Sequence, residues 1–181
     1  MYGNEINIEI EPFSSKHRKM CEGFDCGNDA LNNLLKNAEE ICGDGSSVTS
    51  VVVNKDESII IGFYSLNASL LLYKPDSAFP KICGFPAIEI NTFAMDVKYQ
   101  GLPYSDDEED IFNLSDYILA KVISDIYYFS DTVIGAKFII LYSVPNAVNF
   151  YSRNGFKKIN DYMLPLSDPF VNDCHLMYFE L

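Results

Sequence analysis

Hydrophobic residues recur along the chain at two spacings, one of two residues and one of three to four. The first spacing is typical of half-exposed strands, and the second is typical of helices with one apolar face. Alternating or continuous apolar runs predict strands at residues 6–10, 48–54, 58–72, 87–97, 136–144, 156–159 and 176–181. Helical spacing predicts helices at residues 30–41, 113–129 and 147–154. The order of these elements predicts an α/β fold built on a mixed sheet.

Polar and glycine residues at the helix ends agree with these boundaries. The Gly27-Asn28-Asp29 sequence precedes the first helix, and Asn113 stands where the second helix needs a capping side chain. Gly155 follows the third helix, at the position where a left-handed backbone commonly ends a helix. The pattern therefore predicts both the type and the limits of the helices.

The chain of 181 residues contains no internal repeat and no Gly/Ser-rich linker, so we predict one domain over residues 1–181. One stretch interrupts the pattern, because Asp106-Asp107-Glu108-Glu109-Asp110 cannot belong to a core element. We interpret residues 102–112 as an acidic loop inserted between a strand and a helix.

Composition and charge narrow the function classes. A hydrophobic content of 48% is too high for a disordered chain. The 13 Lys and Arg against 26 Asp and Glu give a formal charge of −13. Proteins that bind nucleic acids need Lys and Arg to neutralise phosphates. We therefore expect no nucleic-acid partner, and we expect a cationic amine as substrate.

The sequence lacks the residue patterns that are typical of membrane-spanning, secreted and metal-binding proteins. No apolar run approaches the ~20 residues of a membrane-spanning helix. The first residues lack the basic and apolar regions of a signal peptide, so we expect a cytoplasmic protein without a membrane partner. The two histidines, His17 and His175, and the cysteines show no metal-ligand spacing, so we expect no metal. The sequence does not indicate the oligomeric state.

Three stretches resemble the GNAT superfamily of acyl-CoA-dependent N-acyltransferases. Residues 90–101 look like its fourth strand and the start of its pyrophosphate loop, and residues 145–156 match its A-x-x-x-Y-x-x-x-G-F signature. Residues 24–31 are similar to the opening of a GNAT subgroup that includes toxin acetyltransferases. The resemblance spans nearly the whole chain, and it implies a GNAT-like mixed central sheet flanked by helices.

The resemblance implies acetyl-CoA as co-substrate. In such proteins the backbone of one strand pairs with the pantetheine arm, and Phe93, Ala94 and Met95 occupy that strand here. The family's diphosphate loop reads Q/R-x-x-G-x-G/A. Gln100 fits this loop, but Pro103 and Ser105 stand at its glycine positions.

A second alignment with the family's diphosphate loop avoids this mismatch at the glycine positions. If residues 103–112 are an insertion, the helix that follows Asn113 offers its first backbone amides, near Leu114 and Ser115, to the diphosphate. We prefer this register, with Gln100 and Gly101 on the other side of the insertion.

Two side chains are candidates for catalysis. Tyr151 occupies the position of the family's general-acid tyrosine, which protonates the leaving thiolate. Glu89 resembles the strand glutamate that some members use as base, and a water molecule is an equal alternative. Val144 stands where many members carry an asparagine, and Asn146 is the nearby substitute.

We therefore predict an N-acetyltransferase that moves the acetyl group of acetyl-CoA directly to a primary amine of a small molecule or peptide. Two alternatives stay open: a GNAT-fold binding or regulatory protein with a decayed diphosphate loop, and a tRNA-directed acetyltransferase toxin. Cys26 as a nucleophile lacks a histidine at a supporting spacing. The acceptor itself is not predicted.

Overall fold

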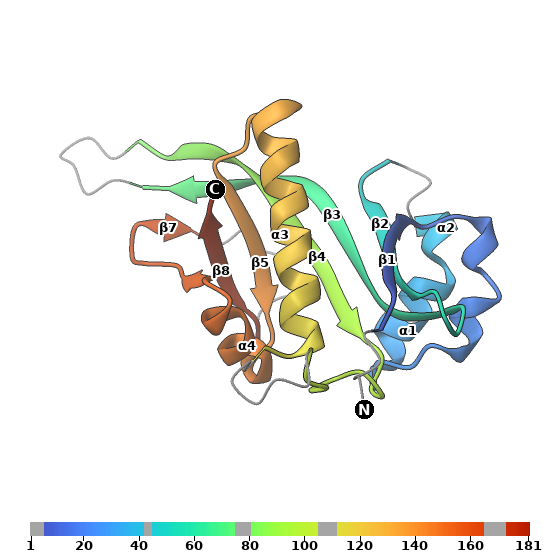
Figure 1. The fold of residues 1–181 in the computed structure, drawn as a ribbon. Helices are drawn as coiled ribbons and strands as arrows, with labels where there is room; N and C mark the ends of the chain where they lie inside the picture. Colours follow the sequence, from blue (N-terminus) through green and yellow to red (C-terminus); the bar gives the residue numbers. More distant parts are fainter. Residues whose placement is uncertain (1–5, 42–44, 75–80, 105–111, 165–172) are drawn as a thin grey trace. The chain divides into compact units, whose positions relative to one another are not determined.

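The computed structural model describes residues 6–41, 45–74, 81–104, 112–164 and 173–181 (Figure 1). Its strands are β1 (Ile8–Pro12), β2 (Val48–Asn54), β3 (Ile59–Tyr73), β4 (Cys83–Met95), β5 (Phe138–Ser143), β6 (Lys157–Lys158), β7 (Met163–Leu164) and β8 (His175–Glu180). Its helices are α1 (Asp29–Lys36), α2 (Ala38–Ile41), α3 (Leu114–Thr132) and α4 (Val148–Arg153). Short 3-10 turns lie at Ser15–His17, Met20–Gly23 and Pro145–Ala147.

The strands of the described residues form one mixed sheet with the order β1-β2-β3-β4-β5-β8-β6, and β7 pairs with β3. The β4–β5 pair is parallel, whereas β1–β2, β2–β3, β5–β8 and β6–β8 are antiparallel. This confirms the predicted α/β fold with a mixed central sheet. No helix among the described residues is long and apolar enough to cross a membrane.

The chain folds into two compact units. Unit 1 comprises residues 1–66 and 92–118, and unit 2 comprises residues 67–91 and 119–181. The strands β3 and β4 and the helix α3 each contribute one part to unit 1 and the other part to unit 2.

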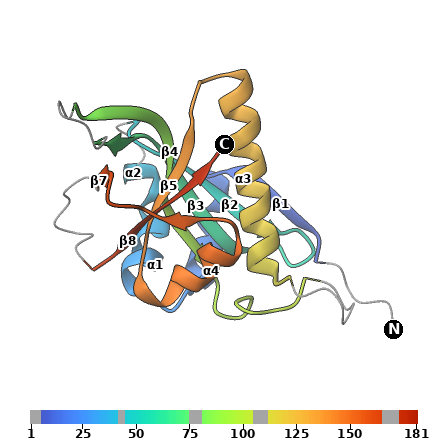
Figure 2. The same ribbon diagram turned by 90° about the vertical axis from the view of Figure 1, so that its left-hand side faces the viewer.

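The core of unit 1 lies on both faces of β2 and β3. Neighbouring strand residues point to opposite faces, so Val51 and Val53 of β2 pack with Leu35 of α1, whereas Val52 packs with Leu114 and Ile118 of α3. Figure 2 lets the reader follow α1 and the start of α3 on the two sides of these strands. The apolar alternation along β2 therefore gives this strand two buried faces.

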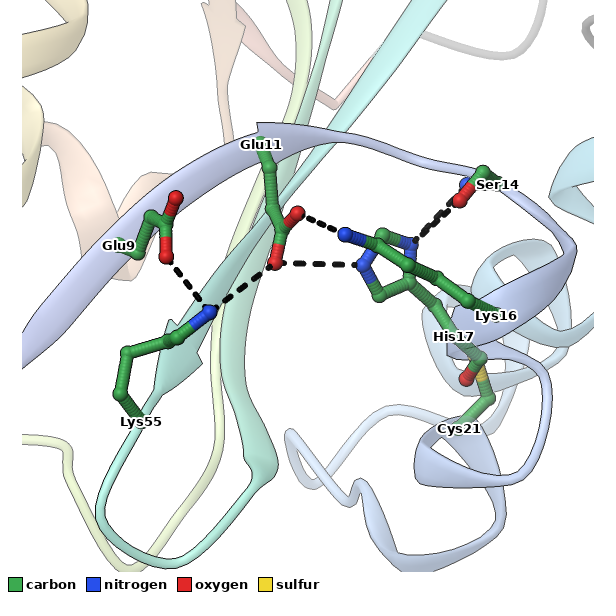
Figure 3. Close-up of polar contacts among 7 residues, drawn as sticks. All are labelled: Glu9, Glu11, Ser14, Lys16, His17, Cys21 and Lys55. Atoms are coloured by element: carbon green, nitrogen blue, oxygen red, sulfur yellow. Dashed lines mark hydrogen bonds and ion pairs between the residues drawn. The ribbon is translucent and has the colours of Figure 1, made fainter.

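A buried histidine ties the first 3-10 turn to β1 (Figure 3). The Ser14 backbone amide donates to Nδ1 of His17 at 3.0 Å, and the other ring nitrogen is Nε2. That nitrogen lies 3.5 Å from Oε1 of Glu11 on β1. Glu11 also pairs with Lys16, and Lys55 pairs with Glu9. His17 is only 1% exposed, so its buried ring holds the turn Ser15–His17 against β1.

Unit 2 is built around β5, whose six residues pair with β8 along their whole length (Figure 1). β6 pairs with β8 on the side away from β5, and it is the last strand of the sheet as far as the structure describes the chain. Leu71, Ala87, Phe138, Ile140 and Leu176 form the buried cluster of this unit. The nearly continuous apolar run at residues 136–144 is thus a central strand, as its pattern indicates.

The structure differs from the predicted elements in a few places. The helix predicted at residues 30–41 is two helices, because Asn37 leaves the helical conformation with φ −104° and ψ 15°. The strand predicted at residues 87–97 begins at Cys83 and ends at Met95. β7 was not predicted, since two residues are too short for a periodic pattern. The acidic run at residues 106–110 lies outside the described residues.

Candidate active site

Tyr151 lies on α4 in an aromatic cluster of unit 2. Its ring meets Phe150 and Phe156 edge to face, with centroid distances of 5.0 and 5.7 Å. Its side chain is 9% exposed, and this burial raises the pKa of the Tyr151 phenol to about 12. The phenol is therefore protonated at neutral pH, as a hydrogen-bond donor to a leaving group must be.

The turn after α4 explains the spacing of the Tyr-x-x-x-Gly-Phe sequence. Gly155 has φ +90°, and a Cβ at this position would lie 3.0 Å from Cε2 of Phe179. The Phe156 amide donates to the Tyr151 carbonyl at 3.1 Å and returns the chain toward the helix. Glycine thus allows Phe156 to pack on the Tyr151 ring.

Glu89 lies on the less buried face of β4. Ile88, Ile90 and Thr92 are buried, whereas Glu89 is half-buried and Asn91 is exposed. The described ladder between β4 and β5 joins Ala87, Ile88 and Glu89 to Phe138, Ile139 and Ile140, so Glu89 is at its end. The alternation that the sequence predicts is confirmed, and the role of Glu89 as base stays a prediction.

Phe93, Ala94 and Met95 continue β4 in unit 1, beyond that ladder. Ala94 packs in the cluster under α1, and Met95 packs with Leu114 and Ile118 on the opposite face. Their side chains are therefore core residues. A pantetheine arm would have to contact their backbone, as the resemblance implies.

The loop after β4 is built on a buried carboxylate. Asp96 is 4% exposed, and its two oxygens accept from the Lys98 amide at 2.9 Å and the Asp25 amide at 3.1 Å. Nε2 of Gln100 donates to the Met95 carbonyl at 2.8 Å and to the Cys26 carbonyl at 3.2 Å. Gly101 follows with φ +73°. Gln100 therefore fixes the loop to the end of the strand.

Residues 25–32 brace the same loop from outside, which the sequence did not reveal. The Val97 amide donates to the Asp25 carbonyl at 2.8 Å. Asn32 donates from Nδ2 to Oδ1 of Asp25 at 2.9 Å, and its Oδ1 accepts from the Cys26 amide at 2.9 Å. The segment that resembles toxin acetyltransferases is thus a structural support for the loop, with the short polar spacing Asp25–Asn32 as its sequence signal.

The base of the acidic insertion is a small antiparallel bridge. Pro103 pairs with Asn113, the Tyr104 amide donates to the Phe112 carbonyl at 2.8 Å, and the Leu114 amide donates to the Leu102 carbonyl at 2.8 Å. The prediction of a free amide at Leu114 is therefore wrong, because the Leu102 carbonyl accepts from that amide.

The rest of the first turn of α3 is largely paired as well. The Asp116 and Tyr117 amides donate to the Asn113 carbonyl at 2.9 and 3.1 Å, and the Asn113 amide donates to Oδ2 of Asp116. Among the described residues, the Ser115 amide is the one in this turn without a recorded backbone acceptor. An anion at this helix start would have Ser115 as its main-chain donor.

Asn146, a predicted site residue, and Cys26, the rejected nucleophile, also have clear positions. Asn146 is exposed in the 3-10 turn Pro145–Ala147 that leads into α4. Cys26 is half-buried, its Sγ donates to the Asn28 carbonyl at 3.7 Å, and burial raises the pKa of its thiol. A raised thiol pKa disfavours the thiolate, so Cys26 is not an activated nucleophile. The described residues contain no group of three or more His, Cys, Asp or Glu that could hold a metal ion.

The negative charge of the chain is unevenly distributed between the units. Unit 1 has six Lys and Arg against eighteen Asp and Glu, so it carries −12 of the total of −13. Unit 2 has eight Asp and Glu and carries −1. The cations of unit 2 are Lys74, Lys81, Lys121, Lys137, Arg153, Lys157 and Lys158.

No protein-family model and no curated protein sequence matches the chain. Solved structures do match over nearly its whole length. A tyrosine-to-phenylalanine mutant of KacT has a TM-score of 0.70 and 21% identity and covers 96% of this chain and 94% of its own. A similar mutant of the AtaT toxin has a TM-score of 0.70 and 17% identity over 99% of this chain and 93% of its own.

Several similar structures include a partner. AtaT complexed with acetyl-methionyl-tRNAfMet has a TM-score of 0.67 and 19% identity over 96% of this chain and 95% of its own. Others are a KacTA–DNA complex and AtaTR bound with acetyl-CoA.

These complexes overturn the expectation that a chain of this kind has no nucleic-acid partner and takes a cationic amine. That expectation is wrong because net charge is a sum over the whole chain, whereas nucleic acids bind to local surfaces. The near-neutral unit 2 illustrates the error. Over nearly its whole length this chain folds as KacT and the AtaT toxin do.

Proposed function

We propose that the chain is an acetyl-CoA-dependent N-acetyltransferase whose acceptor is the α-amine of an aminoacyl-tRNA. The observation that carries the proposal is the fold match, over 96% of the chain, to AtaT complexed with acetyl-methionyl-tRNAfMet. The buried Tyr151 in its signature turn supplies a protonated phenol for the chemistry.

In the proposed reaction the amine nitrogen attacks the thioester carbonyl, an N–C bond forms and the C–S bond breaks. The ammonium form of the amine loses two protons overall, of which one ends on the thiolate of coenzyme A and the other in solvent. An α-amine has an ordinary pKa of about 8, against about 10.4 for a lysine side chain. It is therefore more easily deprotonated at neutral pH, by Glu89 or by water.

Tyr151 acts on the leaving sulfur. Full transfer of a proton from a phenol with a pKa of about 12 to a thiolate with a pKa of about 8.5 is uphill by roughly 5 kcal/mol. The phenol therefore first donates a hydrogen bond to the sulfur. It gives up its proton only when a proton from the amine takes the place of that proton on the phenol oxygen.

Acetyl-CoA is proposed to lie with its pantetheine arm on the backbone of Phe93, Ala94 and Met95. Its diphosphate lies near the Ser115 amide and the loop at Gln100 and Gly101. The polar groups that remain for the diphosphate are few, because Asp96 and the bridge at Pro103 use most of the nearby amides.

The substitution Tyr151→Phe tests the proposed chemistry. Loss of the hydroxyl should lower kcat for acetyl transfer by about 10²–10⁴-fold and leave the Kd for acetyl-CoA unchanged. The matched control is Tyr128→Phe, because Tyr128 is 70% exposed on α3. Equal turnover by the Tyr151 variant and the wild type would exclude the acid role.

The few free amides of the diphosphate loop favour one other candidate, a GNAT-fold binding or regulatory protein that does not use acetyl-CoA. A thermal-shift titration separates the two. Acetyl-CoA at a hundredfold its Kd should stabilise the acetyltransferase by about 2.7 kcal/mol. A protein with no shift at millimolar acetyl-CoA would be the binding protein.

A further inference from the structure

The segment that encloses Tyr151 also carries the densest group of cations in unit 2. Arg153 ends α4, and Lys157 and Lys158 form β6, directly after Phe156, whose ring packs on Tyr151. All three are exposed. We call Arg153, Lys157 and Lys158 the basic edge.

The position of β6 leaves the two lysines open to a large partner. Within the part of the chain that the structure describes, β6 pairs only with β8 and is the last strand of the sheet, with Lys157 opposite Tyr178 and Lys158 opposite Met177. Adjacent strand residues point to opposite faces, so the two ammonium groups flank the edge. A chain of phosphates that follows the edge can contact both.

Local charge favours a polyanion at this edge. Within the described residues, no carboxylate is recorded within ion-pair distance of Lys157 or Lys158. Lys16, Arg18 and Lys55 of unit 1, by contrast, each pair with a glutamate. Among the described residues, the acids that follow the basic edge most closely in sequence are Asp161 and Asp173, both exposed. Lys157 and Lys158 therefore follow the Tyr151 segment with no described ion pair, in the unit that carries only −1.

We infer that the basic edge binds the phosphate backbone of the acceptor nucleic acid and so brings the acceptor end toward Tyr151. The inference rests on the proposed function, and it names the surface that holds the substrate. Lysines on an edge strand also prevent strand-to-strand association. That simpler role predicts no change in nucleic-acid binding when the charges are removed.

The test is the double variant Lys157→Gln/Lys158→Gln, with unfractionated tRNA as the probe in a fluorescence binding assay. Each lost phosphate contact lowers the slope of log K against log salt by about 0.7–0.9. We expect the slope to fall by about 1.5 and the Kd at low salt to rise roughly tenfold. The matched control Lys16→Gln/Lys55→Gln removes the same charge from unit 1, where both lysines are paired with glutamates, and should change neither quantity.

Steady-state acetyl transfer then separates this inference from the proposed function. The double variant should raise KM for aminoacyl-tRNA and leave both kcat and the Kd for acetyl-CoA unchanged. If the wild type transfers acetyl groups and the double variant keeps the same KM and the same salt slope, the inference about the basic edge is wrong and the proposed function stands. Absence of transfer in the wild type would overturn the proposed function, and the tRNA-binding assay would still decide whether the basic edge contacts phosphate.

Discussion

At the scale of single residues, the Tyr-x-x-x-Gly-Phe sequence predicts where the helix ends, but it does not reveal why a glycine is needed there. The pattern indicates a helix end at Gly155, but the contact of this glycine with Phe179 joins two distant parts of the sequence. The resemblance likewise predicts an acid role for Tyr151, but its aromatic neighbours and its raised pKa depend on how the chain folds around it.

The substitution Gly155→Ala should therefore destabilise the protein. A left-handed backbone costs a residue with a Cβ about 1–3 kcal/mol, and the 3.0 Å approach to Phe179 adds to this cost. Urea unfolding of the variant should give a free energy lower by at least about 1 kcal/mol. Gly135→Ala is the control, since a Cβ there meets nothing within 4 Å. Equal losses in both variants would contradict the explanation.

The Asp25 carboxylate gives a second residue-scale prediction. The Gly27 amide, and then Asn32, hold the pKa of Asp25 below its usual value. A lowered folded-state pKa adds stability that is present above the unfolded value near 3.8 and is lost as the pH falls through the folded value. The melting temperature should therefore fall less steeply below pH 4 for Asp25→Asn than for the wild type. Parallel curves for the two proteins would show that Asp25 does not contribute to the acid transition.

At the scale of elements, the periodicity predicts the helices and strands because each needs only local spacing. The break at Asn37 was missed because Leu34, Leu35 and Ala38 continue the helical spacing across it. The support of the loop after β4 could not be predicted either. Its bonds join residues far apart in sequence, such as Asp25 and Asp96, which no local pattern connects.

Asn32→Ala tests that support. The variant leaves the Cys26 amide without its acceptor and removes one of the two donors to the Asp25 carboxylate, the other being the Gly27 amide, which costs about 1–3 kcal/mol of stability. Under the proposed function it should also raise the Kd for acetyl-CoA more than it lowers kcat, because it loosens the loop that meets the diphosphate. The adjacent Asn33→Ala, at an exposed position of the same helix, is the matched control. Equal Kd values for acetyl-CoA in the two variants would show that residues 25–32 do not contribute to acetyl-CoA binding.

At the scale of the whole molecule, the fold was predicted correctly from the sequence, whereas the prediction of partners from the net charge was wrong. The resemblance of three stretches in the right order predicted a mixed α/β fold, which the chain shares with the KacT and AtaT structures. The value of −13 suggested the exclusion of nucleic acids, because a sequence alone does not tell which charges gather in one unit. The acceptor was left open for a related reason, since it depends on surfaces that distant segments form together.

The central claim is acetyl transfer to an aminoacyl-tRNA, and one assay tests it directly. The protein is incubated with acetyl-CoA and a mixture of charged tRNAs, the ester bonds are hydrolysed, and the released amino acids are analysed by mass spectrometry. The account predicts N-acetylated amino acids that require acetyl-CoA and fall about 10²–10⁴-fold with Tyr151→Phe. Unmodified amino acids from every tRNA, with a protein that binds acetyl-CoA, would contradict it.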